Sequence, residues 1–306
     1  MNPLHILLPI LLLSLAALAP RSAAQNVHFA REASDTTRIT DILKAEAATD
    51  RPGNVTRIAA YFTDTPYGAG TLDRDSVETL TVNLDSLDCT TFVETVLALA
   101  YTAREYRQSW RDFTYNLARL RYRGGEENGY GSRLHYVSEW IVDNVARGNL
   151  REVTADIPGV RYAVKSLDYM SRHADAYPAL ANESNLQAIR NVESGYANHR
   201  FPYIKASAVK TKTLAPVVRD GDVVIFTTSI HGLDATHMGI IKLRDDGTSL
   251  LLHASSKAAR RPADAPRICG TPAPRRDPHR PPQRRLTSPH TTGSHTLIPY
   301  TIRAPI

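Results

Sequence analysis

Three residues of this sequence carry the side chains that nucleophilic catalysis requires: Cys89, His237 and His253. A thiolate attacks carbonyl carbon atoms efficiently, and a neighbouring imidazole can take up and return the proton that such a reaction moves. Cys89 and Cys269 are the only cysteines in the chain, so no disulfide framework accounts for Cys89. The alternative is that Cys89 is a small buried apolar side chain, which composition alone favours.

Cys89 is predicted to begin a helix. Apolar side chains recur at three- and four-residue intervals between residues 92 and 100, which predicts a helix from residue 89 to about residue 104. Asp88 is then the N-cap. The N–H groups of a first helical turn have no intrahelical partner, and the helix dipole is positive there, so this position favours the thiolate of Cys89. The N–H of Cys89 itself would serve as one donor to an oxyanion.

His237 and His253 are predicted to lie on neighbouring antiparallel strands. A turn at residues 245–247 separates the two apolar runs that contain them. Side chains on one face of adjacent strands approach each other, so a base and a second polar group that orients it are expected to meet here. His231 is a further candidate base in the strand region, and it is left without a role.

Helical patterns precede strand patterns along the chain, which predicts an α+β domain with the helices packed on one side of the sheet. An edge strand is expected at residues 80–84, leading into the turn at Asp88. Helices are expected from residue 35 and at residues 55–62, 89–104, 110–121, 134–145 and 185–196, and the antiparallel strands at residues 223–226, 237–241 and 249–253.

The first 24 residues have the pattern of a secretory signal peptide. An uncharged apolar run, Ile6 to Leu18, is followed by the small residues Ser22 to Ala24, which suits cleavage before Gln25. The run of about thirteen residues is shorter than the roughly 20 that span a bilayer. We therefore expect an exported, periplasmic protein without a membrane span.

The net charge of +6 is unevenly distributed along the chain. Residues 258–306 contain nine Arg and two Asp, whereas the other 257 residues contain 28 Lys and Arg against 29 Asp and Glu. The part expected to fold is nearly neutral, so the charge gives no indication of nucleic-acid binding. Ten of the nineteen prolines also fall within residues 258–306, and we expect this segment to be a disordered tail.

Several short motifs together resemble a known family. They are Thr65–Gly68, Leu87–Glu94, Ser132–Tyr136 with Trp140, Gly221–Asp222 with Gly232–Gly239, and Leu252–Ser256. They resemble the NlpC-type papain-like cell-wall cysteine hydrolases, in particular the N-acetylmuramoyl-L-alanine amidase-like branch, over about residues 35–257. The resemblance implies a papain-like domain at residues 25–257, with a helical part at about 35–200 and a sheet part at about 215–257. Extra helices are inserted between the cysteine helix and the strands.

The resemblance also implies roles and a substrate. Cys89 is the nucleophile, His237 the base that later becomes the acid, and His253 the residue that orients it. The substrate is a peptidoglycan fragment in which a muramyl sugar, preferably in its anhydro form, is joined to the L-Ala of a stem peptide, and no metal or cofactor is required. Substrate contacts are expected from five residues: Tyr67, whose hydroxyl would lie beside Cys89, Asp88, and the helix-initial Arg133, His135 and Tyr136. An ordinary surface or structural role is the alternative for each.

Other readings remain open on the sequence alone. The same three residues would serve a peptidase that cuts within the stem peptide. A zinc amidase would use His231, His237 and His253 as ligands, although no His-Glu-x-x-His run or similar pattern is present. A non-catalytic wall-binding protein is the third alternative.

The tail departs from the family pattern, in which further strand and helix follow the 249–253 strand. A shifted reading frame after about codon 257, or a divergent extension, would explain the change. Absence of the closing elements would leave an unpaired sheet edge. A basic tail that binds anionic wall polymer is the alternative.

Overall fold

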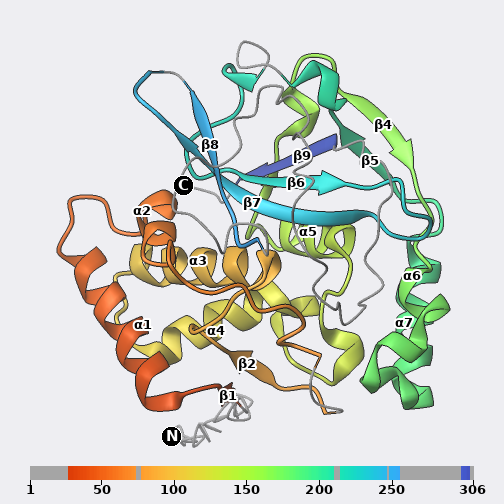
Figure 1. Ribbon diagram of the computed structural model, residues 1–306, viewed down its shortest axis with the longest axis horizontal. Helices are drawn as coiled ribbons and strands as arrows, with labels where there is room; N and C mark the ends of the chain where they lie inside the picture. The colour runs from red at the N-terminus through yellow and green to blue at the C-terminus, as the bar shows by residue number, and fades with distance from the viewer. Residues whose placement is uncertain (1–26, 74–76, 210–213, 247, 256–297, 304–306) are drawn as a thin grey trace, which may run out of the picture.

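A computed structural model of the chain describes residues 27–73, 77–209, 214–246, 248–255 and 298–303. It is a mixed α/β structure with one five-stranded sheet and two two-stranded sheets (Figure 1). The helices are α1 (Glu32–Ala47), α2 (Val55–Ala60), α3 (Cys89–Arg104), α4 (Trp110–Arg121), α5 (Val137–Ala146), α6 (Tyr169–Arg172) and α7 (Glu183–Gly195). The strands are β1 (Val27–Phe29), β2 (Leu80–Val82), β3 (Arg151–Glu152), β4 (Arg161–Val164), β5 (Arg200–Tyr203), β6 (Val223–Thr227), β7 (Ala235–Leu243), β8 (Ser249–Leu252) and β9 (Ile298–Arg303).

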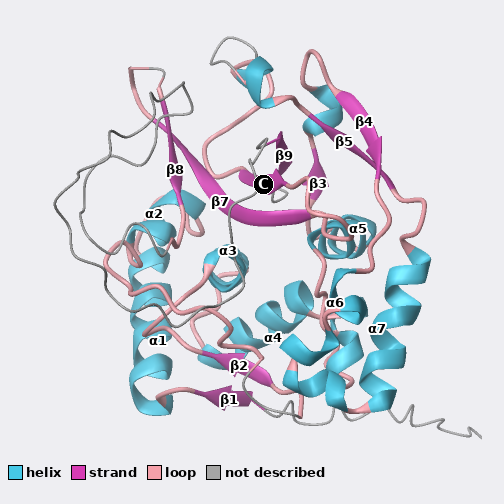
Figure 2. Ribbon diagram, turned by 45° about the vertical axis from the view of Figure 1, so that its right-hand side comes forward, coloured by secondary structure: helices cyan, strands magenta, loops and turns pink. Residues whose placement is uncertain are grey.

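Helix α3 is the central helix of the structure, and it confirms the helix predicted from residue 89. Its side chains are buried on nearly every face, with Val93, Val96 and Leu97 fully inaccessible to solvent. A helix that is apolar all round is stable only when it is enclosed. The enclosing elements are α1, α2 and α4 on the helical side and β7 on the sheet side. Figure 2 shows α3 nearly end-on beneath β7, with α5 on the same side of the sheet.

The five-stranded sheet has the order β3-β9-β6-β7-β8, and all of its pairs are antiparallel. The predicted order of three antiparallel strands is confirmed by β6, β7 and β8. Their inner residues are apolar and buried, among them Val223, Ile225 and Ile240. The strand predicted near residue 80 also forms, but it pairs in parallel with β1 in a separate two-stranded sheet.

The prediction of a disordered tail is wrong for residues 298–303. These residues form β9, which pairs with β6 from Val223 to Thr227 and with β3 at its end. Strand β9 therefore pairs with the side of β6 that faces away from β7. Pro299 lies opposite Phe226 of β6 and beyond the two residues of β9 that pair with β3. A six-residue strand that gains its partners from distant segments has little local signature. The rest of the predicted tail lies outside the described residues.

The helix predicted at residues 134–145 begins later, at Val137. Tyr136 is extended, with φ −96° and ψ 140°, and therefore acts as the N-cap. Arg133, His135 and Tyr136 precede the helix instead of starting it. No helix in the described part of the chain has the length and apolar character needed to cross a lipid bilayer.

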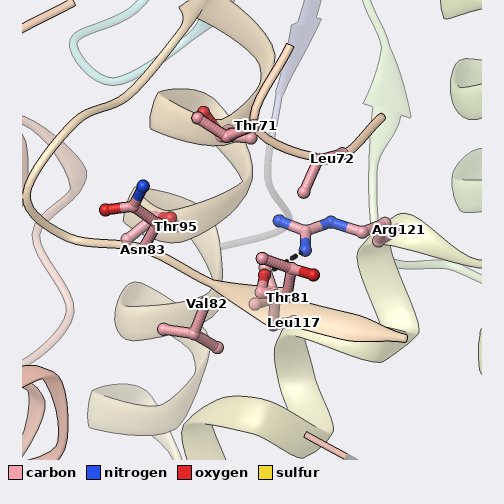
Figure 3. Close-up of a pocket in the computed structure, with 9 residues that line it drawn as sticks. Thr71, Leu72, Thr81, Val82, Asn83, Thr95, Leu117 and Arg121 are labelled. Atoms are coloured by element: carbon pink, nitrogen blue, oxygen red, sulfur yellow. Dashed lines mark hydrogen bonds between the residues drawn. The ribbon is translucent and has the colours of Figure 1, made fainter. Parts of the chain in front are cut away.

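A buried ion pair joins α3 to α4. Arg121 Nε donates to Glu94 Oε2 at 2.7 Å, and both side chains are almost completely buried. Arg121 Nη1 also donates to the carbonyl oxygen of Thr81 in β2, at 2.6 Å, beside a small pocket between α3, α4 and β2 (Figure 3). The guanidinium thus ties three elements together beneath the helix that carries Cys89.

Replacing Arg121 by Met should lower the free energy of unfolding by about 3–5 kcal/mol, because Glu94 would be left buried without its partner. Urea denaturation followed by circular dichroism measures this loss. Adding Glu94→Leu to the Arg121→Met variant should recover much of it. The control is Arg190→Met, which breaks the exposed pair with Glu183 and should cost less than about 1 kcal/mol. Equal losses of unfolding free energy for the two Arg variants would contradict the stabilising role of the buried Glu94–Arg121 pair.

Candidate active site

Cys89 is the first residue of α3, and the turn before it is held by a capping box. Asp88 Oδ1 accepts hydrogen bonds from the N–H and the hydroxyl of Thr91, each at 2.8 Å. The Asp88 N–H donates in return to Thr91 Oγ1 at 2.9 Å. Cys89 is half-buried against the main core and forms no disulfide. The predicted N-cap is confirmed, and the contacts of Asp88 Oδ1 are internal.

Strand β7 lies directly against the Cys89 thiol. The backbone N–H groups of Met238 and of Cys89, together with the Thr90 hydroxyl, hydrogen-bond the sulfur and act to lower its pKa. Burial and the neighbouring Asp88 carboxylate outweigh them and raise the pKa of Cys89 above its usual value. The helix start favours the thiolate, as expected, but burial has the larger effect because enclosing the sulfur removes the water that would stabilise its charge.

His237 and His253 are in direct contact. His237 Nε2 lies 2.6 Å from His253 Nδ1, and the two rings meet edge to face with their centroids 4.8 Å apart. His237 is on β7, immediately before Met238, and His253 directly follows β8. The two strands pair up to Ile240 and Leu252, so the histidines are diagonal neighbours across the ladder. The predicted meeting of the two side chains is confirmed.

Both histidines are neutral at ordinary pH. Burial and the adjacent His253 lower the pKa of His237 to about 4. Burial alone lowers the pKa of His253. One ring nitrogen of each histidine is used in the His237–His253 hydrogen bond, which leaves Nδ1 of His237 for a second partner.

A glycine permits the close approach of β8 to β7 beside the histidines. A Cβ atom on Gly239 would lie 2.8 Å from the Leu252 carbonyl oxygen and 3.0 Å from His253 Cβ. Neither the strand backbone nor the base of a side chain can move away easily. Gly239 therefore sets the spacing that brings His253 to His237.

The backbone of Tyr67 lies next to the segment that leads into Cys89. It forms an isolated bridge with Leu87, and the N–H of Gly68 donates to the Leu87 carbonyl oxygen at 3.2 Å. Burial raises the pKa of the Tyr67 hydroxyl, and negative charge on Cys89 and on Asp88 raises it further. About a third of the residue remains exposed, so Tyr67 lies at the surface, and its contact with substrate remains a prediction.

The three other residues predicted to contact substrate make internal contacts. Arg133 is buried and paired with Asp73 at 2.5 Å and with Glu78 at 3.2 Å. His135 Nε2 lies 2.8 Å from the Tyr130 carbonyl oxygen, and burial lowers its pKa well below the usual value.

Tyr136 is also buried. Its hydroxyl donates to Glu193 at 2.7 Å and accepts from the Met170 N–H at 2.8 Å. These contacts join α5 to α6 and α7. For Arg133, His135 and Tyr136 alike, contact with substrate remains a prediction.

His231 is separate from the two histidines of the site. It is exposed, with Nδ1 2.9 Å from Arg172 Nη1 and 3.5 Å from Asp168 Oδ1. Within the described residues, His, Cys, Asp and Glu side chains form no group of three that could hold a metal ion. The three ligands of the zinc alternative are thus not brought together.

Asp234 is a buried residue near the site that the sequence did not single out. It lies three residues before His237, and only 3% of it is exposed. Its two carboxylate oxygens accept hydrogen bonds from the backbone N–H groups of Ser138 and Ala235. No local sequence pattern reveals this, because Ser138 is 96 positions away.

Comparison with known proteins decides the family. The model of the AmiA-like family, described as N-acetylmuramoyl-L-alanine amidase-like, matches residues 57–266. The chain belongs to this family. Two solved structures of an N-acetylmuramoyl-L-alanine amidase from Bacteroides uniformis ATCC 8492 are similar to it. One is 30% identical, covers 83% of this chain and 98% of its own, and has a TM-score of 0.67. The other is 31% identical, covers 82% and 99%, and has a TM-score of 0.66.

A Bacteroides fragilis structure named as a candidate xylanase is 34% identical to this chain. It covers 81% of this chain and 99% of its own, with a TM-score of 0.65. No curated protein matches the chain. Membership of the amidase-like family supports a hydrolase that acts on peptidoglycan.

The rate at which iodoacetamide alkylates Cys89 should keep increasing into the alkaline range, because burial raises the pKa of this thiol above its usual value. Mass spectrometry of the modified peptide, sampled over time from pH 5 to pH 10, measures the rate. A plateau reached already near pH 6 would show a preformed thiolate–imidazolium pair and would contradict the neutral site.

Replacing Gly239 by Ala should lower the turnover number more than tenfold and the free energy of unfolding by about 1–3 kcal/mol, because the new methyl group forces β7 and β8 apart. Steady-state kinetics and urea denaturation measure the two effects. Gly195→Ala is the control, since a Cβ there meets no atom within 4 Å. Wild-type turnover in Gly239→Ala would show that this spacing does not matter for catalysis.

Proposed function

We propose that this protein is a cysteine amidase that cleaves the bond between N-acetylmuramic acid, preferably in its anhydro form, and the L-Ala of peptidoglycan fragments. One observation carries the proposal. His237 Nε2 lies 2.6 Å from His253 Nδ1, and the residue that follows His237 in β7, Met238, hydrogen-bonds the Cys89 sulfur through its backbone. The nucleophile is thus carried by α3, the base by β7, and the group that orients the base by the residue directly after β8. Family membership supports the amidase activity and the substrate class.

The mechanism follows from the protonation states. His237 is neutral and Cys89 holds its proton, so His237 Nδ1 removes that proton as the sulfur attacks the lactyl carbonyl carbon. Once the sulfur is bonded to carbon it no longer holds the N–H of Cys89, which then donates to the oxyanion that forms on the carbonyl oxygen. When the C–N bond breaks, His237 gives the proton to the departing alanine nitrogen. Water then attacks the thioester, and His237 carries the water proton back to the sulfur.

His253 orients this exchange. With His237 Nε2 donating to His253 Nδ1, the lone pair of the base is on Nδ1, the nitrogen that must face the thiol. When His237 becomes an imidazolium during attack, it still donates through Nε2, so the contact is kept in both protonation states. Tyr67, beside Cys89 and exposed, is the residue best placed to contact the sugar or the peptide.

The structure and the sequence also support a proposed fold type and cellular location. The cysteine helix packed on an antiparallel sheet supports a papain-like core of the NlpC type. The apolar run at the amino terminus supports export to the periplasm.

Incubation with defined muropeptides, followed by mass spectrometry, tests the proposal. Wild-type protein should release a stem peptide that begins with L-Ala, together with the free muramyl sugar. Cys89→Ala should lose activity by about 10⁴-fold or more, and His237→Ala by about 10²–10⁴-fold. His173→Ala, which removes an exposed histidine, is the matched control and should retain full activity.

Three outcomes would contradict parts of the proposal. Products that keep L-Ala on the muramyl sugar would show a stem-peptide endopeptidase. Equal cleavage by wild-type and Cys89→Ala protein would eliminate the nucleophile. Loss of activity with a chelator, but not with iodoacetamide, would favour the zinc alternative.

A further inference from the structure

We propose that Asp234 is a positioning residue for His237: it fixes the start of β7 to α5 and so aims the imidazole at Cys89. The inference rests on the proposed function for its catalytic readout. Asp234 does not contact the reacting atoms. It acts through the short backbone segment that joins it to His237.

The two carboxylate oxygens of Asp234 hold different segments of the chain. Oδ2 accepts from the N–H of Ser138, in the first turn of α5, at 2.5 Å. Oδ1 accepts from the N–H of Ala235, the first residue of β7, at 2.8 Å. The Asp234 carbonyl oxygen accepts from the Thr228 N–H at 3.1 Å, which closes the loop between β6 and β7. One side chain therefore fixes the strand start to a helix and shapes the loop that leads into it.

This cap differs from the other helix caps of the structure. The starts of α2, α4 and α7 are capped by the neighbouring polar residues Asn54, Ser109 and Asn182. Tyr136 occupies the N-cap position of α5, but its side chain makes no capping hydrogen bond. A carboxylate 96 positions away takes its place, although burial raises the pKa of Asp234 and so opposes its charge. A local polar residue would be enough to cap α5. We therefore infer that the hydrogen bond from Ser138 to the distant Asp234 serves to hold the start of β7.

The start of β7 needs such a connection because the strand is irregular there. Thr227 pairs with Ala235 and Phe226 pairs with His237, so Thr236 is an extra residue in the ladder. Thr236 is exposed, as expected for a residue bulged out of the pairing. A β-bulge bends a strand and turns the next side chain to a new direction. The direction of His237 therefore depends on how firmly the residues before the bulge are held.

The helix that receives Asp234 is itself rigidly placed. Trp140 of α5 is 2% exposed in the main core, and Asn144 Nδ2 donates to the Leu120 carbonyl oxygen of α4 at 2.9 Å. Helix α4 packs on α3, which carries Cys89. Asp234 thus connects the strand that carries the base to the same group of packed helices that carries the nucleophile.

A graded series of variants tests the inference. Asp234→Ala removes both acceptors and should lower the turnover number about 10–100-fold with KM changed less than about twofold, since a shift of about 1 Å costs up to about 10² in rate. Asp234→Asn keeps one acceptor and should give an intermediate loss. Asn182→Ala removes the cap of α7 and should leave turnover unchanged.

A double-mutant cycle separates positioning from a general loss of structure. In a His237→Ala background, Asp234→Ala should produce no further loss of the residual rate, because Asp234 acts through His237. A loss of the same factor in both backgrounds, or full turnover in Asp234→Ala, would overturn the inference.

A measurement without substrate tests the positioning role of Asp234 independently of the proposed function. NMR titration of the His237 ring should give a pKa of about 4 in wild-type protein. In Asp234→Ala it should move toward 6.5, as the ring leaves its buried place, whereas Asn182→Ala should leave it unchanged. If wild-type protein cleaves no muropeptide while this shift occurs, the proposed function fails and the positioning role stands. An unchanged His237 pKa in Asp234→Ala would overturn the positioning role even if wild-type protein cleaves muropeptides.

Discussion

The packing of helix α3 against strand β7 is the contact on which the rest of this structure depends. It places the first residue of the helix, Cys89, beside the strand that carries His237. The contact is stable because α3 is buried on almost every face and α1, α2 and α4 enclose its other sides. The site thus lies at the boundary between the helical part and the sheet, where one helix end meets one strand edge.

The same burial determines the electrostatics of the site. Enclosing the thiol and the imidazole opposes charge on each, which raises the pKa of Cys89 and lowers that of His237. Burial therefore favours the uncharged form of both side chains. The helix start still lowers the pKa of Cys89 through N–H groups that face the sulfur, but burial outweighs this effect.

Long-range connections give the site its rigidity. Asp234 joins the start of β7 to α5, Arg121 joins α4 to α3 and β2, and β9 joins the sheet from the far end of the chain. Each connects segments that are at least 27 positions apart. Asp234 and the Glu94–Arg121 pair are buried charged groups, whose burial costs free energy unless their partners are well placed. These buried groups surround α3 and β7, so they limit small movements of the helix that carries Cys89 and of the strand that carries His237.

The sequence by itself determined the parts of the protein that follow from local pattern. The apolar period after Asp88 predicted α3 and its cap, and the two apolar runs around the 245–247 turn predicted that His237 and His253 would meet. Short motifs pointed to the amidase-like family that the comparison shows. Only the tertiary structure decided the neutral state of the thiol, the internal partners of Arg133 and Tyr136, the buried role of Asp234 and the pairing of β9. Helix period and turn chemistry act over a few residues, whereas burial and long-range hydrogen bonds depend on which distant segments the fold brings together.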